Sequence, residues 1–173
     1  MEPAPTVPQE PVLTPEEQAE QERLAAEQAR EKRLQALLDS MTLEEKVGQL
    51  FFVRCPETNA VEDISTYHLG GYLLFGRDFK VGDSWLTKEQ FLEKIQSSQD
   101  AAKIPLFIGS DEEGGTATRA SRNPNLFSEP FKSPQAIYSA GGMEALAQDA
   151  LDKSQALLDL GIPAEDIGEI NID

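Results

Sequence analysis

The sequence has few of the residues from which disulfides, thiolate metal clusters and histidine-based catalytic sites are built. Its 173 residues include one cysteine, Cys55, and one histidine, His68. A lone cysteine excludes an intrachain disulfide and a thiolate metal cluster, and the apolar setting of Cys55 predicts a buried, unreactive side chain. His68 ends an expected helix, a position that suits a histidine electrostatically, so we assign it no catalytic role. Because no second acidic cluster stands at a suitable spacing, we expect no bound metal and no cofactor.

Positive charge is scarce as well. The chain carries 31 acidic and 15 basic residues, a formal net charge of −16. It has no basic stripe of the kind that neutralises a phosphate backbone, which excludes nucleic acid as a partner. The apolar runs are too short to span a bilayer, so we expect no transmembrane segment.

The first 40 residues differ in composition from the rest. Residues 1–13 carry four prolines and two acids, a composition typical of a solvated linker. Residues 14–40 begin with a capping box and Pro15, and continue as a charged helix. The proline-rich start resembles a stalk behind an export or lipoprotein signal. We therefore expect an extracellular or cell-surface protein if a signal has been removed, and otherwise a cytoplasmic one.

The segment 41–162 alternates helices and strands. Capping boxes at Thr42 and Thr87 predict two helix starts, and apolar runs predict buried strands over residues 50–53, 72–75 and 104–110. Residues 83–86 are expected to form a loop, and an amphipathic helix is expected from Ser133 to Gly161. Such alternation predicts an α/β fold with a parallel sheet. A closed barrel of eight such units needs about 250 residues, so the chain would be an incomplete one.

One loop contains several residues of the types that bind polar ligands. The strand-like run that starts at Ile104 is followed by Asp111, Glu113, two glycines and Arg119. Polar residues directly after a buried parallel strand lie at the edge where α/β proteins bind ligands. The glycines are not a phosphate-binding loop, because the Lys-Ser/Thr that would follow them is absent. We interpret this loop as a binding site for a polar ligand.

Several pieces of the chain, in order, resemble the N-terminal domain of glycoside hydrolase family 3. The pieces are Met41-Thr42-Leu43-Glu44-Glu45-Lys46-Val47-Gly48-Gln49-Leu50-Phe51, Gly70-Gly71-Tyr72-Leu73-Leu74-Phe75, Ile104-Pro105-Leu106, Asp111-Glu112-Glu113-Gly114-Gly115 with Arg119, and Leu158-Asp159-Leu160-Gly161-Ile162. The resemblance is strongest to the bacterial β-N-acetylhexosaminidases of that family. It implies a TIM-like barrel that cleaves terminal β-linked N-acetylglucosamine with retention of configuration. The implied partner is a glycan or muropeptide fragment that contains N-acetylglucosamine.

The resemblance also implies roles for individual residues. Asp111 matches the aspartate that binds sugar hydroxyls, and Arg119 matches a companion arginine that orients the substrate. Glu113, Gly114 and Gly115 match the rest of the substrate-binding motif. The family's catalytic nucleophile and its histidine acid/base belong to later segments that these 173 residues do not contain. We therefore expect no catalytic residue in this chain and no activity from it alone.

The last residues depart from the family pattern. Residues 163–173 are too acidic for the buried fourth strand that the resemblance implies, so they are interpreted as a divergent tail. An incomplete barrel exposes a strand edge, and we expect the isolated chain to associate or partly unfold. A monodisperse monomer that melts cooperatively would contradict this expectation.

Two other functions remain open from the sequence. The chain could be a non-catalytic carbohydrate-binding or interaction module, or part of a family 3 enzyme of different specificity such as a β-glucosidase. Residues 104–119 do not distinguish these alternatives, because the residues that would read an N-acetyl group lie mostly later.

Overall fold

The computed structural model describes residues 14–162 and divides the chain after Met41 into two compact units. In the first unit, helix α1 (Pro15–Ser40) starts at the predicted capping box, where the Thr14 side chain accepts from Glu17 N and Glu17 Oε2 accepts from Thr14 N. None of its residues is buried. The expected linker over residues 1–13 and the expected tail over residues 163–173 lie outside the described residues.

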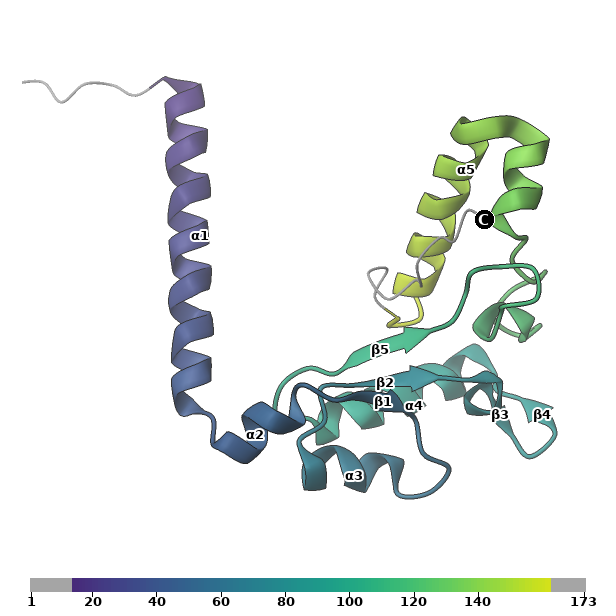
Figure 1. Cartoon of the computed structure of the whole chain (residues 1–173), viewed down its shortest axis with the longest axis horizontal. Coiled ribbons are helices and arrows are strands. Elements are labelled where there is room, and N and C mark those ends of the chain that lie inside the picture. The colour runs from purple at the N-terminus through teal and green to yellow at the C-terminus, as the bar shows by residue number, and fades with distance from the viewer. Residues whose placement is uncertain (1–13, 163–173) are drawn as a thin grey trace, which may run out of the picture. The chain divides into compact units, whose positions relative to one another are not determined.

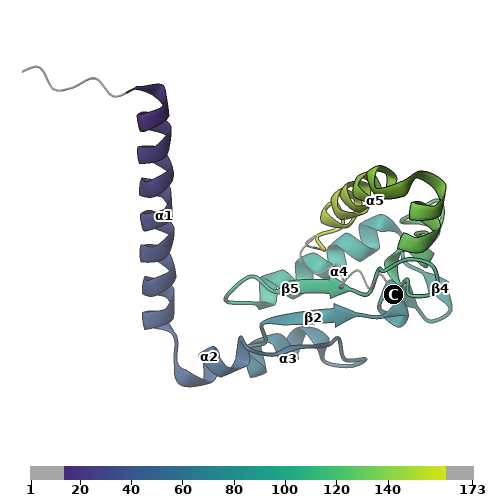
Figure 2. The ribbon, with the colours of Figure 1, turned by 45° about the horizontal axis from the view of Figure 1, so that its top comes forward.

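The second unit is built around a parallel sheet (Figures 1 and 2). Its order is α2 (Leu43–Gly48), β1 (Phe52–Arg54), α3 (Ala60–Tyr67), β2 (Gly71–Leu74), the 3₁₀ helix η1 (Gly76–Phe79), β3 (Lys80–Val81), β4 (Ser84–Trp85), α4 (Lys88–Ala101), β5 (Phe107–Ser110), the 3₁₀ helix η2 (Ala120–Arg122) and α5 (Pro134–Leu158). The sheet order is β1-β2-β5, with both pairings parallel. The fold is therefore the expected α/β class, an incomplete TIM-like barrel whose sequence is preceded by a charged helix.

One face of the sheet carries the core. Tyr72 lies beside Ile108 in the strand register, and both side chains are buried. They belong to one apolar cluster with Ile64 of α3 and with Phe91 and Ile95 of α4. Alternation along a strand sends every second side chain to this face. The two helices that connect consecutive strands therefore cover the same side of the sheet.

The other face of the sheet is open, which corrects the prediction of a buried strand at 50–53. Phe52, Gly71 and Phe107 lie side by side in register, and Phe52 and Phe107 remain 46% and 56% exposed. Leu50 is 83% exposed and precedes the strand. In a closed barrel this face points inward, and three strands do not close. Strands β1 and β5 are the two edges of the described sheet, and the expected association through them stays a prediction.

Strand β5 is shorter than the predicted 104–110. The backbone of Leu106 is bonded to the side chain of Gln99, with Leu106 N donating to Oε1 and Leu106 O accepting from Nε2, both at 2.9 Å. Pro105 has no N–H to donate to a ladder. The ladder therefore begins at Phe107.

Two further predictions are corrected. The expected loop at residues 83–86 is partly the antiparallel β3–β4 hairpin, which turns at Gly82 with a φ of 58°. The expected helix after Ser133 is interrupted at Gly141 and Gly142, where Gly142 has a φ of 67°. Glycine adopts such angles without steric cost, so a pair of them ends one helical segment and lets another start.

Candidate functional site

Each of the three parallel strands delivers a side chain to the same edge of the sheet. Arg54 is the last residue of β1, Phe75 directly follows β2, and Asp111 directly follows β5. The carboxyl ends of parallel strands form one rim, where α/β folds place their ligands. Arg119 reaches the same rim from the loop after β5, because its Nη2 donates to Asp111 Oδ2 at 2.9 Å.

The ion pair between Asp111 and Arg119 is partly open to solvent. The two side chains are 32% and 25% exposed. Arg119 is further fixed by a bond from its Nη1 to the carbonyl of Thr118, at 2.9 Å. Oδ1 of Asp111 accepts no hydrogen bond from the residues that the structure describes, so one carboxylate oxygen can still take a hydroxyl donor. The structure thus brings two predicted sugar-binding residues together.

Glu112, which the sequence reasoning did not single out, shapes the loop. Its side chain is 1% exposed. Oε1 accepts from the backbone N–H of Arg119 at 2.6 Å and from that of Ala120, and Oε2 accepts from Ser121 N at 3.4 Å. A buried carboxylate is stable only when such donors replace water. Glu112 therefore closes the loop by holding the start of η2, and it sets where the Arg119 side chain begins.

Glu113 does not share that role. Its side chain points to solvent and makes no hydrogen bond with the described part of the chain. Bracing of the loop comes from its neighbour Glu112 instead, and a contact of Glu113 with a sugar stays a prediction.

The paired glycines bring the loop against residues 131–133. Gly114 has a φ of 97°, and a Cβ on it would lie 2.1 Å from the carbonyl oxygen of Lys132. Gly115 has a φ of 64°, and its N–H donates to Phe131 O at 2.8 Å. A side chain at Gly114 would meet backbone, which cannot move aside cheaply. These glycines fit the loop to its support, and a contact with substrate is not needed to explain them.

Helix α5 contacts the 131–133 segment on which the glycine loop rests. Lys153 is 8% exposed, and its Nζ donates to the carbonyl of Lys132 at 2.9 Å. Nζ also pairs with Asp149 at 2.6 Å, one helical turn earlier. A buried ammonium needs such partners. The glycine loop, the 131–133 segment and α5 therefore form one connected unit.

Phe75 is fixed by a buried aspartate. Asp78 is 5% exposed, and its Oδ2 accepts from Phe75 N at 2.7 Å. Lys94 of α4 donates to the carbonyl of Asp78 at 2.8 Å. Nearby, burial and then the charge of Asp78 raise the pKa of the Cys55 thiol to about 11. Cys55 is 2% exposed, which confirms the prediction that it is buried, and its lack of reactivity stays a prediction.

Neither His68 nor the buried Phe79 offers a side chain to a ligand at the rim. His68 precedes β2 and so belongs to the amino end of the sheet, opposite the rim. Phe79 is fully buried and stacks on Phe91 at 5.0 Å. Within residues 14–162, no group of three or more metal-ligating side chains is placed to hold an ion. The same stretch contains no helix long and apolar enough to cross a membrane.

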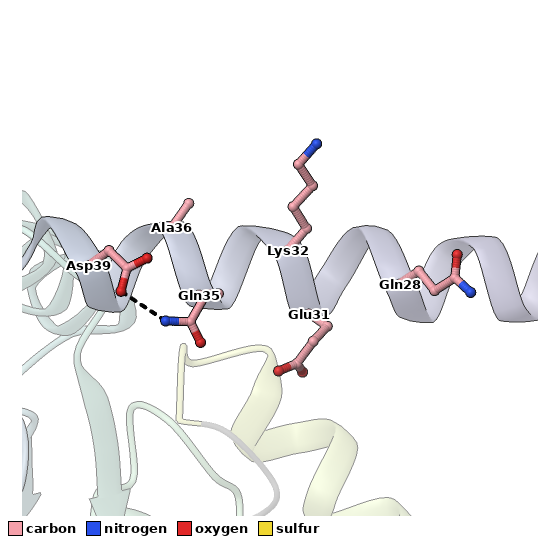
Figure 3. Close-up of a pocket in the computed structure, with 6 residues that line it drawn as sticks. All are labelled: Gln28, Glu31, Lys32, Gln35, Ala36 and Asp39. Carbon is pink, nitrogen blue, oxygen red and sulfur yellow. Dashed lines mark hydrogen bonds between the residues drawn. The ribbon is translucent and has the colours of Figure 1, made fainter.

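A shallow hollow on α1 is not a convincing site. Its lining residues are Gln28, Glu31, Lys32, Gln35, Ala36 and Asp39 (Figure 3). All six come from one helix, and Gln35 Nε2 donates to Asp39 Oδ1 at 2.8 Å. Ligand sites are concave and are enclosed from several sides, which a single helix face is not.

Two of the residues at the rim could have been found from the sequence. Arg54 and Phe75 stand at the carboxyl ends of two predicted strands, which is the position that made Asp111 a candidate. Treating all strand ends alike would have named them. The sequence did not indicate a role for Glu112, because three consecutive acids do not reveal which of them is buried.

Comparison with known proteins relates this arrangement to one protein family and to solved structures. The model of the glycosyl hydrolase family 3 N-terminal domain matches residues 42–165. A crystal structure of a glycosyl hydrolase of the same family from Mycobacterium smegmatis is similar in fold, with a TM-score of 0.54 at 21% sequence identity. That likeness covers 71% of this chain and 34% of the other, so the chain spans about a third of that protein. No curated protein matches the chain.

Proposed function

Because the chain belongs to glycosyl hydrolase family 3, we propose that it supplies part of the substrate site of a β-N-acetylhexosaminidase. The proposed reaction is hydrolysis of terminal β-linked N-acetylglucosamine with retention of configuration. The proposed substrate is a glycan or muropeptide fragment that carries this sugar. One observation carries the proposal: Asp111 and Arg119 pair at the carboxyl rim of the sheet and keep one carboxylate oxygen free.

The geometry suits holding a sugar. The free Oδ1 of Asp111 can accept from a sugar hydroxyl, and a bond to an ionised acceptor is short and directional. Arg119 holds that carboxylate in place through the bond from its Nη2 to Oδ2, and a guanidinium offers its N–H donors in a fixed planar fork. Such contacts fix the ring for attack at the anomeric carbon without taking part in bond breaking.

Bond cleavage is assigned to other parts of the enzyme. Retaining hydrolysis needs a nucleophile and a second group that serves as acid and then as base. Asp111 is engaged with Arg119, and Glu112 is engaged with backbone donors. We therefore propose that these 173 residues alone do not turn over substrate and that the catalytic pair comes from later segments of the barrel.

The test compares the 173-residue chain with a version extended through the whole barrel. Both are assayed with chromogenic β-N-acetylglucosaminide and β-glucoside. We expect turnover by the extended protein alone, with preference for the N-acetylated substrate. Preference for the glucoside would favour a β-glucosidase, and binding without turnover in the extended protein would favour a carbohydrate-binding module.

Asp111→Ala in the extended protein tests the assigned role. Losing charge-assisted hydrogen bonds of about 1.5–3 kcal/mol each should lower kcat/KM by about 100-fold. Glu93→Ala, an exposed acid on α4, is the matched control and should leave the kinetics unchanged. Equal kinetics for the two variants would remove Asp111 from the site.

A further inference from the structure

Arg54 is the cation that remains unpaired at the rim. It ends β1, its side chain is exposed, and it forms no ion pair with a described residue. Its neighbour across the sheet is Leu73, and next to Leu73 is Gly109, which has no side chain. Arg54 is thus the charged side chain at this level of the open face.

Two guanidinium groups lie over the ring of Phe75. The Cζ atoms of Arg54 and Arg119 lie 4.5 Å and 5.7 Å from the centre of its ring. Stacking on an aromatic ring leaves the in-plane N–H donors of an arginine free, because the ring contacts only the face of the guanidinium. The bond that Phe75 N donates to Asp78 Oδ2 in turn fixes the backbone from which the ring projects.

The charges at the rim differ in how they are satisfied. Asp111 and Arg119 neutralise each other, and the buried Glu112 is satisfied by backbone donors. Arg54 contributes a planar set of donors with no acceptor. In a protein with a net charge of −16, an anionic ligand is repelled at long range, so its recognition requires a local cation of this kind.

We propose that Arg54 binds a carboxylate carried by the saccharide, so that the site selects acidic over neutral saccharides. A planar guanidinium can take both oxygens of a carboxylate in two parallel hydrogen bonds. Phe75 positions Arg54 for this contact. The inference rests on the proposed function, because it takes the rim to be the sugar site.

The test uses three probes in NMR titrations with the version of the protein that is extended through the whole barrel. N-acetylglucosamine reports the sugar site itself. N-acetylmuramic acid is the same sugar with a lactyl ether, and its methyl ester replaces the charged carboxylate with a neutral group of nearly the same size. We expect the acid to bind about tenfold more tightly than the ester, as one half-exposed ionic contact would give.

Variants assign the effect to one side chain. Arg54→Gln should reduce the tenfold ratio to near one, and Arg54→Lys should keep part of it because the charge stays and the planar fork is lost. Arg30→Gln, an exposed arginine of α1, is the control and should keep the full ratio. The Arg54 Nε–H signal, shifted upfield by the Phe75 ring, should move on titration with the acid and not with the ester.

The outcomes separate the two proposals. If N-acetylglucosamine binds and the acid and ester bind equally, the carboxylate contact is wrong while the sugar site stands. If a tenfold ratio persists in Arg54→Gln, another residue reads the charge and the assignment is overturned. If none of the three probes binds a chain whose circular dichroism shows it folded, both proposals fail.

Discussion

Replacing Glu112 by Gln should lower the free energy of unfolding far more than replacing Glu113 by Gln. The two residues are neighbours and carry the same charge, but only Glu112 is buried. Glu112→Gln keeps the size of the side chain and one acceptor oxygen. It removes the negative charge and replaces the second oxygen with an amide NH₂ group.

The magnitude follows from the contacts. The retained oxygen can still accept from Arg119 N and Ala120 N, as Oε1 now does, but without charge assistance. The new NH₂ group faces Ser121 N, a donor that now reaches Oε2 at 3.4 Å. Hydrogen bonds to charged groups contribute about 1.5–3 kcal/mol and neutral ones about 1 kcal/mol. Ser110 Oγ also donates to Oε1, at 3.3 Å. Three weakened bonds and one donor facing a donor therefore give a loss of about 2–3 kcal/mol, while Glu113→Gln should change stability by less than about 0.5 kcal/mol.

The assay is urea unfolding of the 173-residue chain, followed by far-ultraviolet circular dichroism and by the fluorescence of Trp85. We expect the midpoint to fall for Glu112→Gln and to stay for Glu113→Gln. Equal midpoints for the two variants would show that the buried carboxylate does not hold η2, and the structural reasoning about this loop would be wrong.

Two further predictions concern the loop support and the cysteine. Gly114→Ala should destabilise the chain by about 2–4 kcal/mol in urea unfolding, because it combines a positive φ with a clash against backbone. The control is Gly76→Ala, where a Cβ would meet nothing within 4 Å. Equal losses of stability for the two variants would contradict the packing argument. Alkylation of Cys55 should be much slower in the folded chain than in urea. In the folded chain its rate should rise about tenfold per pH unit from pH 8 to 10, because burial raises the pKa of the thiol to about 11. A rate that levels off near pH 9 would mean an ordinary, accessible thiol.

Local signals in the sequence located most of the fold. The capping boxes at Thr14, Thr42 and Thr87 each start a helix in the structure. The strands were harder, because an apolar run shows that residues favour burial and not which face is covered. Phe52 is apolar and half exposed, since the side of the sheet it belongs to has no described element packed on it. The β3–β4 hairpin was missed because each of its strands is two residues long.

The site was predictable where it depends on strand order and unpredictable where it depends on loop geometry. Asp111 follows a recognisable strand, and its pairing with Arg119 needs only a loop that returns. Which of three consecutive acids turns inward depends on where η2 places its N–H groups, and this is a tertiary property. The same holds for Lys153, whose burial is set by the carbonyl of Lys132.

The contact between Lys153 and the segment that supports the glycine loop affects the order in which the protein folds during synthesis. Asp111 and its loop leave the ribosome well before α5, which supplies the ammonium that holds Lys132 and thereby the surface on which Gly114 rests. The support of the loop cannot form before α5 has been synthesised, because the bond to Lys132 requires Lys153. During synthesis the parallel strands can pair first, while the rim matures only when α5 has docked. A nascent chain would thus have its sheet before it can bind a ligand.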